Sequence, residues 1–172
     1  TNTKLVKCNE DHLELSNGTK IHHSFIIFTG GIEASLITSE LDVEKNGRGQ
    51  IIVNEFMQSD KYENIFAIGD MAEIKNKKGE IMPPNVTIAR ISGTNAGQNI
   101  LRHIAKKKLI SCDPKLEGIL IALGGKYAAG NLYGLVHVQG RIAYEIKKYV
   151  FSSYRKPLLK LIKAGYKRLK KL

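Results

Sequence analysis

Residues 64–70 read NIFAIGD, an apolar run that ends in a glycine followed by an aspartate. A glycine at the end of a strand lets a ligand approach the backbone closely. An aspartate beside it offers two acceptor oxygens that suit the hydroxyls of a sugar or sugar alcohol. In open α/β sheets, ligands bind beyond the carboxyl ends of the strands, which is where Gly69 and Asp70 would lie. By itself such a pair is more often a turn than a site, so it needs support from the rest of the chain.

The elements that would position this pair indicate an α/β fold. Apolar alternation and turn residues predict short strands at 4–8, 13–17, 20–28, 48–56 and 64–70. Asn17-Gly18 is a suitable hairpin turn between the second and third of these strands. The last strand is apolar on both faces, which is typical of a central strand covered on each side.

The second half of the chain reads as a helix, a set of strands and further helix. Asn85 is a suitable N-cap after two prolines and opens a predicted helix over 85–108. Residues 117–140 read as a glycine-punctuated meander of strands, and two helical segments finish the chain. Residues 76–80, NKKGE, indicate a turn that faces solvent.

The composition is that of an ordinary globular protein, and the net charge of +11 is unevenly distributed. With 172 residues, 42% of them hydrophobic, the chain can bury a core in one or two small domains. Its apolar stretches fall far short of the roughly 20 residues that a membrane-spanning helix requires. The last nineteen residues carry eight lysines or arginines and no acid, which leaves nineteen basic and sixteen acidic residues elsewhere. The basicity therefore belongs to the end of the chain and indicates a segment for attachment rather than a basic domain.

The tail is amphipathic as well as basic. From Pro157 the apolar side of a helix is formed by Leu158, Leu161, Ile162, Tyr166 and Leu169. The remaining sides carry lysines, among them Lys160, Lys163 and Lys167. Such a helix lies in the interface of an anionic lipid surface, where each basic residue contributes about 1 kcal/mol. The alternative is that the stripe packs on the chain's own domain or on a second copy in a homodimer.

Cysteines and histidines add little chemistry to this picture. Cys8 and Cys112 lie far apart and form no C-x-x-C, which fits a reduced environment and packing thiols. None of the five histidines shows ligand spacing, and the consecutive His22 and His23 would point to opposite faces of a strand. We expect no metal site.

Residues 48–73, RGQIIVNEFMQSDKYENIFAIGDMAE, closely resemble the second flavin-binding segment of two-dinucleotide-domain flavoproteins, in which the final aspartate holds a ribityl hydroxyl of FAD. FIIFTGG at 25–31 is similar to the segment where such chains return from the NAD(P)H domain to the FAD domain. Together with MPPNVTIARISGTNAGQNI at 82–100, the meander and the basic end, the ordered set resembles the carboxyl half of type II NADH:quinone oxidoreductases. These belong to the pyridine nucleotide-disulphide oxidoreductase-like flavoproteins, and the resemblance covers nearly the whole chain.

The resemblance also shows what is missing. Enzymes of this family carry one G-x-G-x-x-G turn for FAD and another for NADH, and neither occurs in these 172 residues. We therefore interpret the chain as a carboxyl-terminal portion that binds FAD weakly or not at all and is inactive alone. The implied domains are 1–28, the last strands of the NADH domain; 29–110, the returning FAD segment; 111–153, a meander and helix near flavin and quinone; and 154–172, a membrane-binding helix.

The resemblance implies a function for the whole enzyme. NADH gives hydride to FAD, and two electrons then pass to a membrane quinone without proton pumping, as part of a respiratory chain. The enzyme would be a peripheral protein on the cytoplasmic face of the inner membrane. Its partners would be quinone and anionic lipid, with no nucleic acid.

Roles for single residues follow from the same resemblance. Gly69 and Asp70 would hold the ribityl chain of FAD, with Thr29, Gly30 and Gly31 at the crossover near the flavin. In the helix that starts after Asn85, the residues Thr87, Ile88 and Ala89 would point free N–H groups and the positive end of the helix dipole at the isoalloxazine.

Two further positions concern the quinone. Lys147, in YEIKKY, matches a family lysine close to the isoalloxazine and the quinone pocket. Family members commonly carry Ala-Gln near the helix start, with the glutamine at the quinone site, whereas this chain has Val86 and Thr87. Thr87 is shorter than glutamine and offers no amide, so the identity of the quinone is open at this point.

Two other classes of function remain open. A sulfide:quinone oxidoreductase shares the fold, but its chemistry needs a pair of cysteines at the flavin, and neither Cys8 nor Cys112 falls in a segment expected there. A non-catalytic basic module that binds nucleic acid or membrane would explain the lysines. A nucleic-acid-binding module predicts basic residues spread over a face with stacking aromatics rather than a leucine stripe.

Overall fold

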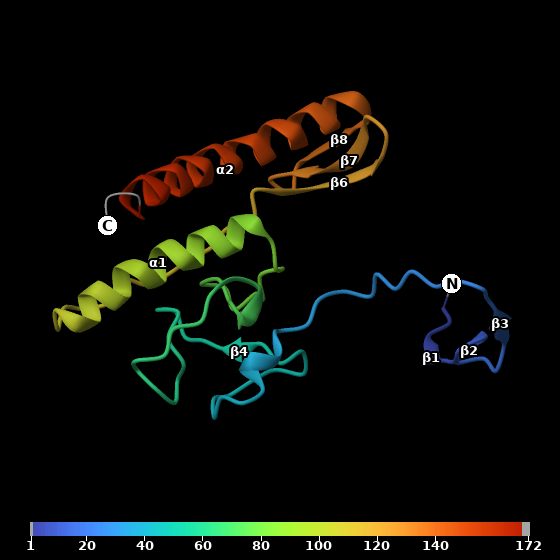
Figure 1. Cartoon of the computed structure of the whole chain (residues 1–172), viewed down its shortest axis with the longest axis horizontal. Helices are drawn as coiled ribbons and strands as arrows, with labels where there is room; N and C mark the ends of the chain where they lie inside the picture. The colour runs from blue at the N-terminus through green and yellow to red at the C-terminus, as the bar shows by residue number, and fades with distance from the viewer. Residues whose placement is uncertain (1, 170–172) are drawn as a thin grey trace. The chain divides into compact units, whose positions relative to one another are not determined.

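The computed structural model describes the backbone of residues 2–169 and the side chains of residues 2–162. The chain folds as two separate units, Thr1–Ile32 and Glu33–Leu172 (Figure 1). The mixed helix-and-strand architecture expected from the sequence is confirmed.

The first unit is a three-stranded antiparallel sheet. Its strands are β1 (Leu5–Cys8), β2 (His12–Leu15) and β3 (Lys20–His22), in that spatial order. The predicted hairpin turn is confirmed: Gly18 has φ +81°, and the Asn17 side chain accepts a hydrogen bond of 3.0 Å from the Thr19 N–H. A positive φ at this position is what glycine allows at little cost.

The third strand is shorter than predicted. It ends at His22, and residues 24–32 have no regular secondary structure, although the sequence indicated a strand to residue 28. Phe25, Ile27 and Phe28 are 75–79% exposed. A strand needs a neighbour for its backbone hydrogen bonds, and among the described residues none pairs with 24–28. The apolar run therefore cannot form a strand here on its side-chain pattern alone.

Most of the second unit's first half consists of tight loops rather than the predicted strands. The parallel pair β4 (Ile51–Ile52) and β5 (Ala72–Glu73) and two short 3₁₀ turns, η1 (Leu36–Thr38) and η2 (Gly69–Met71), are its regular elements. The strand predicted at 64–70 is wrong. Only Phe66 makes a bridge, to Gln58, and Ile68 is 42% exposed instead of covered on both faces.

Three copies of one loop recur in this part of the second unit. Asn46, Asn54 and Asn76 each accept, through Oδ1, hydrogen bonds from the N–H groups two and four residues later. In each copy the residue at the fourth position has a positive φ: Gly49, Met57 and Gly79. Asparagine side chains stabilise such turns by replacing a backbone partner. The first two loops, at 46–50 and 54–58, leave only a short strand between them. The third loop confirms the turn predicted at 76–80.

The core of this unit lies between the loops and the helix α1 (Val86–Ile104). Its buried apolar residues are Ile51, Val53, Met57, Ala67, Ala72, Ile74, Ile88, Ala96 and Cys112. Asn85 caps α1 as predicted, with Oδ1 accepting from the Ile88 N–H at 3.0 Å. The helix ends four residues earlier than expected, because Lys106 adopts φ +53° and its successor bonds back to the Arg102 carbonyl.

The predicted meander is confirmed as a three-stranded antiparallel sheet. It comprises β6 (Gly118–Gly124), β7 (Tyr127–Leu132) and β8 (Val136–Gln139). Gly130 of β7 lies so close to β6 that a Cβ there would be 1.9 Å from the Ile119 carbonyl oxygen. Glycine is therefore required at position 130, where the backbones of β6 and β7 lie this close together.

One long helix, α2 (Gly140–Leu169), follows the sheet and packs along it (Figure 1). The prediction of two separate helical segments is wrong, because α2 continues through Pro157 instead of starting there. Ala128 of β7 and Ala143 of α2 are both completely buried, as small side chains at a close helix–sheet contact must be.

Candidate functional site

A pocket of about 410 Å³ lies where the start of α1, strand β6 and the middle of α2 meet. Most of its walls are apolar and are formed by Pro83, Pro84, Val86, Ile119, Leu120, Leu132, Val150 and Phe151. Its polar members include Thr87, Lys147 and Tyr154. Ligand pockets in proteins are of about this size and combine apolar walls with a few convergent polar groups.

Thr87 and Lys147, sixty residues apart in the sequence, both line this pocket. The Lys147 ammonium group donates a hydrogen bond of 2.6 Å to the Leu120 carbonyl of β6. That contact fixes a positive charge at the wall of an apolar pocket. The structure thus brings together the two positions for which the sequence predicted a catalytic role.

Tyr154 joins the two helices across the pocket, and the sequence had not singled it out. Its hydroxyl lies 3.0 Å from the Thr87 hydroxyl, and either group can donate in that hydrogen bond. The Arg90 guanidinium lies over the Tyr154 ring, 5.5 Å from its centroid, which is a cation–π distance. Because these contacts depend on a fold that places α2 beside the first turn of α1, no spacing in the sequence could have found them.

Gly69 and Asp70 lie in η2, which packs against α1. Gly69 has φ +61°, and a Cβ there would be 3.4 Å from the Ala89 Cβ, so glycine permits the close approach to the helix. The Gly69 N–H donates to the Ser92 hydroxyl at 3.1 Å, and the Asp70 carbonyl accepts from the Gln50 amide at 3.0 Å. The backbone of this pair is therefore fixed, while the Asp70 side chain is exposed.

The helix start differs from the sequence prediction in one respect. Thr87, Ile88 and Ala89 were expected to present free N–H groups, but the Ile88 N–H donates to Asn85 Oδ1 and the Ala89 N–H to the Asn85 carbonyl. The expectation is wrong for these two amides, because the N-cap and the first helical turn already use them. The Ile88 side chain is also buried in the core.

Thr29, Gly30 and Gly31 belong to the first unit and stay a prediction. The Gly31 N–H bonds to the Thr29 carbonyl at 2.9 Å, and Gly31 has φ +108°. The Phe28 ring lies over Gly30, where a Cβ would be 2.1 Å from it. The segment is thus a tight turn in which the Phe28 ring occupies the space that a side chain at Gly30 would need.

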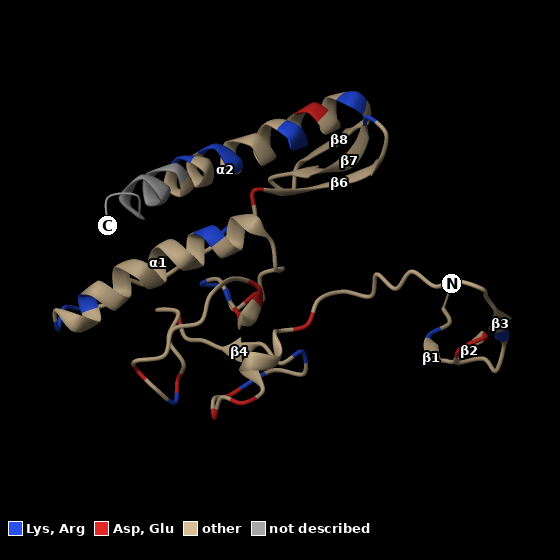
Figure 2. Ribbon diagram, in the orientation of Figure 1, with Lys and Arg blue, Asp and Glu red and all other residues tan. Residues whose placement is uncertain are grey.

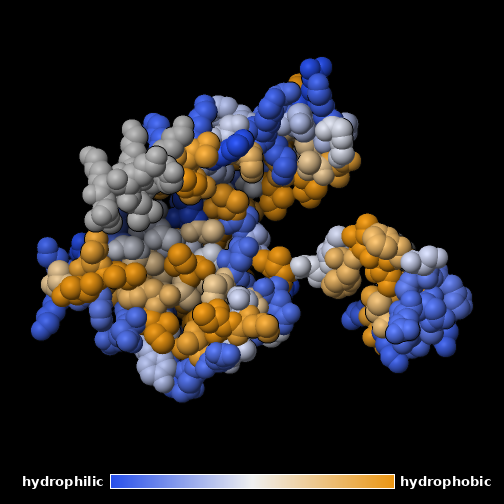
Figure 3. Space-filling model, viewed as in Figure 1, coloured by the Kyte–Doolittle hydropathy of each residue, from blue (hydrophilic) through white to orange (hydrophobic). Residues whose placement is uncertain are grey.

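The tail of α2 is basic and carries exposed apolar residues. Lysines and arginines recur along the helix (Figure 2), and hydrophobic surface is visible over α1 and the β6–β8 sheet (Figure 3). Leu158, Leu161 and Ile162 are 58–68% exposed, and Lys160 is exposed as well. The side chains of Lys163, Tyr166, Lys167 and Leu169 lie outside the described part of the structure. Among the described residues, no helix has both the length and the apolar character needed to cross a membrane.

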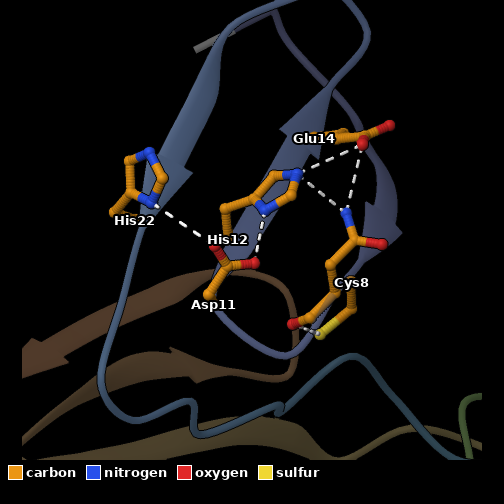
Figure 4. Close-up of polar contacts among 6 residues, drawn as sticks. Cys8, Asp11, His12, Glu14 and His22 are labelled. Carbon is orange, nitrogen blue, oxygen red and sulfur yellow. Dashed lines mark hydrogen bonds and ion pairs between the residues drawn. The ribbon is translucent and has the colours of Figure 1, made fainter.

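A polar cluster in the first unit was not foreseen from the sequence (Figure 4). His12 lies between two carboxylates, with Nδ1 2.6 Å from Asp11 Oδ1 and Nε2 3.3 Å from Glu14 Oε1. The Asn9 amide donates to Glu14, and the His22 Nδ1 lies 3.9 Å from Asp11. Within the described residues no group of three or more His, Cys, Asp or Glu has the geometry of a metal site. The cluster therefore holds the hairpin together by charge-assisted hydrogen bonds.

This cluster predicts an acid-sensitive hairpin. The hydrogen bonds from His12 hold the pKa of Asp11 and that of Glu14 below their ordinary values. A lowered carboxyl pKa means that the folded state favours the ionised form, so the stabilisation is present above the ordinary carboxyl range near pH 4 and is lost as the pH falls through and below it. Acidification to about pH 3 should therefore weaken the hairpin of residues 5–22.

The measurement is a carbon NMR titration of the Asp11 and Glu14 carboxyls together with amide exchange of the hairpin. His12→Gln should raise both carboxyl pKa values, while the matched change His137→Gln in β8 should leave them unchanged. Carboxyl titrations that do not respond to His12→Gln would contradict the role given to this histidine.

Comparison with known proteins places the chain in a family. Residues 1–93 match the pyridine nucleotide-disulphide oxidoreductase family. The type II NADH:quinone oxidoreductase of Haemophilus influenzae is 28% identical over 170 residues, which cover 95% of this chain and 38% of that protein. Mouse ferroptosis suppressor protein 1 is 27% identical over 138 residues, 79% of this chain and 35% of that protein. The chain thus spans less than two fifths of the length of either relative.

The fold has a solved counterpart. A sulfide:quinone oxidoreductase from Aquifex aeolicus superposes with a TM-score of 0.62 at 18% identity, covering 89% of this chain and 39% of that one. Since the family match takes in more than half of the residues and the structural likeness extends over most of the chain, the two comparisons agree on the architecture. The chain therefore belongs to the pyridine nucleotide-disulphide oxidoreductase family, within which it is a relative of the type II NADH:quinone oxidoreductases.

Proposed function

We propose that this chain is the carboxyl-terminal part of an FAD-dependent NADH:quinone oxidoreductase that works at a membrane surface without pumping protons. The observation that carries the proposal is that Thr87 and Lys147 line one apolar pocket. The names of the relatives support NADH as the donor and a quinone as the acceptor. In this proposal residues 1–28 complete the NADH domain and residues 29–110 return to the FAD domain.

The residues around Gly69 and Asp70 fit a flavin cofactor. Gly69 leaves room where a Cβ would contact Ala89, and two hydrogen bonds fix the backbone so that the Asp70 carboxylate is held at the surface. We assign this carboxylate to a ribityl hydroxyl, with Thr29, Gly30 and Gly31 at the crossover. FAD, when bound, supplies the capacity to accept a hydride and pass on electrons.

The pocket fits the head group of a quinone. A quinone ring is flat and apolar apart from its two carbonyl oxygens, and about 410 Å³ with mostly apolar walls accommodates such a ring with part of its tail. Lys147 would place positive charge beside the ring, where negative charge develops as the quinone is reduced. Thr87 would contact the ring from the opposite helix.

The face of α2 that lines the pocket continues into the exposed tail. Lys147, Phe151 and Tyr154 line the pocket, and Leu158, Leu161 and Ile162 follow them at steps of three and four residues, which is the spacing of one helix face. A substrate with an isoprenoid tail could therefore pass along one apolar face from a lipid surface to the pocket. This continuity supports peripheral attachment to anionic lipid, which we assign to the cytoplasmic face of the inner membrane.

An assay of the intact enzyme that carries this sequence tests the proposal. NADH should be oxidised in the presence of a quinone, with FAD required, and sulfide should not replace NADH. Sulfide oxidation without NADH oxidation would instead support the sulfide:quinone alternative. Cys112 is buried and burial raises the pKa of its thiol, so it does not offer the accessible thiolate that sulfide chemistry needs.

Asp70→Ala in the same enzyme should weaken FAD binding about 10- to 100-fold. Hydrogen bonds to a charged group contribute about 1.5–3 kcal/mol, and each 1.4 kcal/mol is a factor of ten. Among the described residues the Asp70 carboxylate makes no hydrogen bond, so the substitution should spare the fold. Flavin fluorescence on titration with FAD measures the effect. Asp60→Ala, another exposed carboxylate, is the control, and equal FAD affinity for both variants would contradict the assignment.

A further inference from the structure

The Tyr154 hydroxyl is positioned to recognise a ligand in the pocket. Tyr154 is half-buried in the pocket wall, and its hydroxyl lies 3.0 Å from Thr87 Oγ1. A phenol both donates and accepts, so when Thr87 donates to the Tyr154 oxygen, the Tyr154 hydrogen is free to bond with a third group. The reverse arrangement would leave the Thr87 hydrogen free instead. In either case the pair offers one hydroxyl hydrogen to the pocket.

The surroundings restrict what that hydrogen can bond. Within the described wall of the pocket, Lys147 is already bonded to the Leu120 carbonyl, and Asn85 Oδ1 already accepts from the Ile88 N–H. Glu117 is exposed, and the other neighbours are mostly apolar side chains. The Arg90 guanidinium over the Tyr154 ring holds the ring in place from the exposed side of α1. A ligand that complements this arrangement is a flat apolar ring with an oxygen acceptor at its edge.

We propose that the Tyr154–Thr87 hydroxyl pair donates a hydrogen bond to a ring carbonyl of the quinone and thereby selects ligands that carry this carbonyl. Tyr154 is then a specificity-determining residue of the pocket. Tyr154 lies between the rest of the pocket lining and the exposed residues Leu158, Leu161 and Ile162 of α2. The ring carbonyl of the quinone would therefore lie at the inner end of the path that its isoprenoid tail would follow. This inference rests on the proposed function, because that function supplies the quinone.

The test compares two ligands of nearly the same shape. Menadione carries two ring carbonyls, whereas 2-methylnaphthalene has the same fused rings and methyl group but no oxygen. Binding of each to the purified full chain is measured by ligand-observed NMR. Tyr154→Phe removes only the hydroxyl, and Tyr149→Phe, an exposed tyrosine on the same helix, is the matched control.

The expected result is selective. Tyr154→Phe should weaken menadione binding about five- to tenfold, the size of one neutral hydrogen bond, and leave 2-methylnaphthalene binding unchanged. Thr87→Val should weaken menadione binding as well, and the double variant should lose less than the sum of the two single losses, because the hydroxyls act as a pair. Tyr149→Phe should bind both ligands like the unaltered chain.

Three outcomes would overturn the inference. Unchanged menadione binding by Tyr154→Phe would show that the Tyr154 hydroxyl does not take part in recognising the quinone. The quinone pocket and the proposed function would still stand. Equal weakening for both ligands would show that Tyr154 acts only by packing. Failure of the unaltered chain to bind menadione would overturn this inference together with the quinone assignment of the pocket.

Discussion

Replacing Asn99 with leucine is expected to lower the free energy of unfolding by about 3 kcal/mol. Asn99 is completely buried, and its side chain ties α1 to two loops. Its amide donates to the Phe56 and Ile110 carbonyls, at 3.1 and 3.0 Å, and its oxygen accepts from the Ile110 N–H at 2.8 Å. Leucine has a similar volume but forms none of these hydrogen bonds. The loss of each bond lowers the free energy of unfolding by about 1 kcal/mol.

Urea denaturation of the full chain, followed by circular dichroism, measures this change. Asn64→Leu is the matched control, because Asn64 is an exposed asparagine that makes no side-chain hydrogen bond among the described residues, and it should shift the midpoint little. If Asn99→Leu were as stable as that control, the buried amide would contribute nothing to holding the 110 segment on the helix, and the core would have to be stabilised by apolar packing alone.

Replacing Leu158, Leu161 and Ile162 together with serine is expected to weaken membrane binding roughly 100-fold. Even half-burial of an apolar side chain of this size in a bilayer interface contributes about 1 kcal/mol, and three of them give about 3 kcal/mol. The three residues are exposed on the tail of α2, so their loss should leave the core unaffected. Co-sedimentation with vesicles that contain phosphatidylglycerol measures the partition coefficient.

The control replaces exposed apolar residues of another helix, Leu101 and Ile104 near the end of α1, with serine. That variant should still bind vesicles, and binding of the unaltered chain should fall at high salt, since the lysines of the tail act through screened charges. Equal loss in both variants would mean that the attachment is a general property of exposed apolar surface. Binding retained by the triple variant would end the membrane role of the tail.

The loops show how much of the fold the sequence could reveal. The polar stretch NKKGE indicated the turn at 76–80 correctly, and Asn46 and Asn76 are each followed three residues later by a glycine with a positive φ. The middle copy has Met57 where the others have glycine, so its turn was hidden in what looked like a strand end. Met57 adopts φ +65° although a left-handed conformation costs a non-glycine residue about 1–2 kcal/mol. Its complete burial in the core compensates for this cost, and burial is a tertiary property that local sequence does not contain.

The candidate site was accessible to sequence reasoning only in part. The N-cap at Asn85 was predictable because capping is local, and it in turn decided which amides of the helix start are engaged. Thr87 and Lys147 came from resemblance, and the fold supplied their common pocket. The Tyr154 contact and the His12 cluster depend on which strands and helices become neighbours. Single-chain periodicity carries no information about those neighbours.

Pro157 lies inside α2, directly between the part of the helix that lines the pocket and the part that carries Leu158 and its successors. A proline has no N–H to give to the carbonyl four residues earlier, so the ladder of helical hydrogen bonds is interrupted at the Ser153 carbonyl. Bending at this joint breaks no further bond. In the proposed attachment to lipid, residues 158–162 can therefore tilt at Pro157 without moving Lys147 and Phe151 in the wall of the binding cavity.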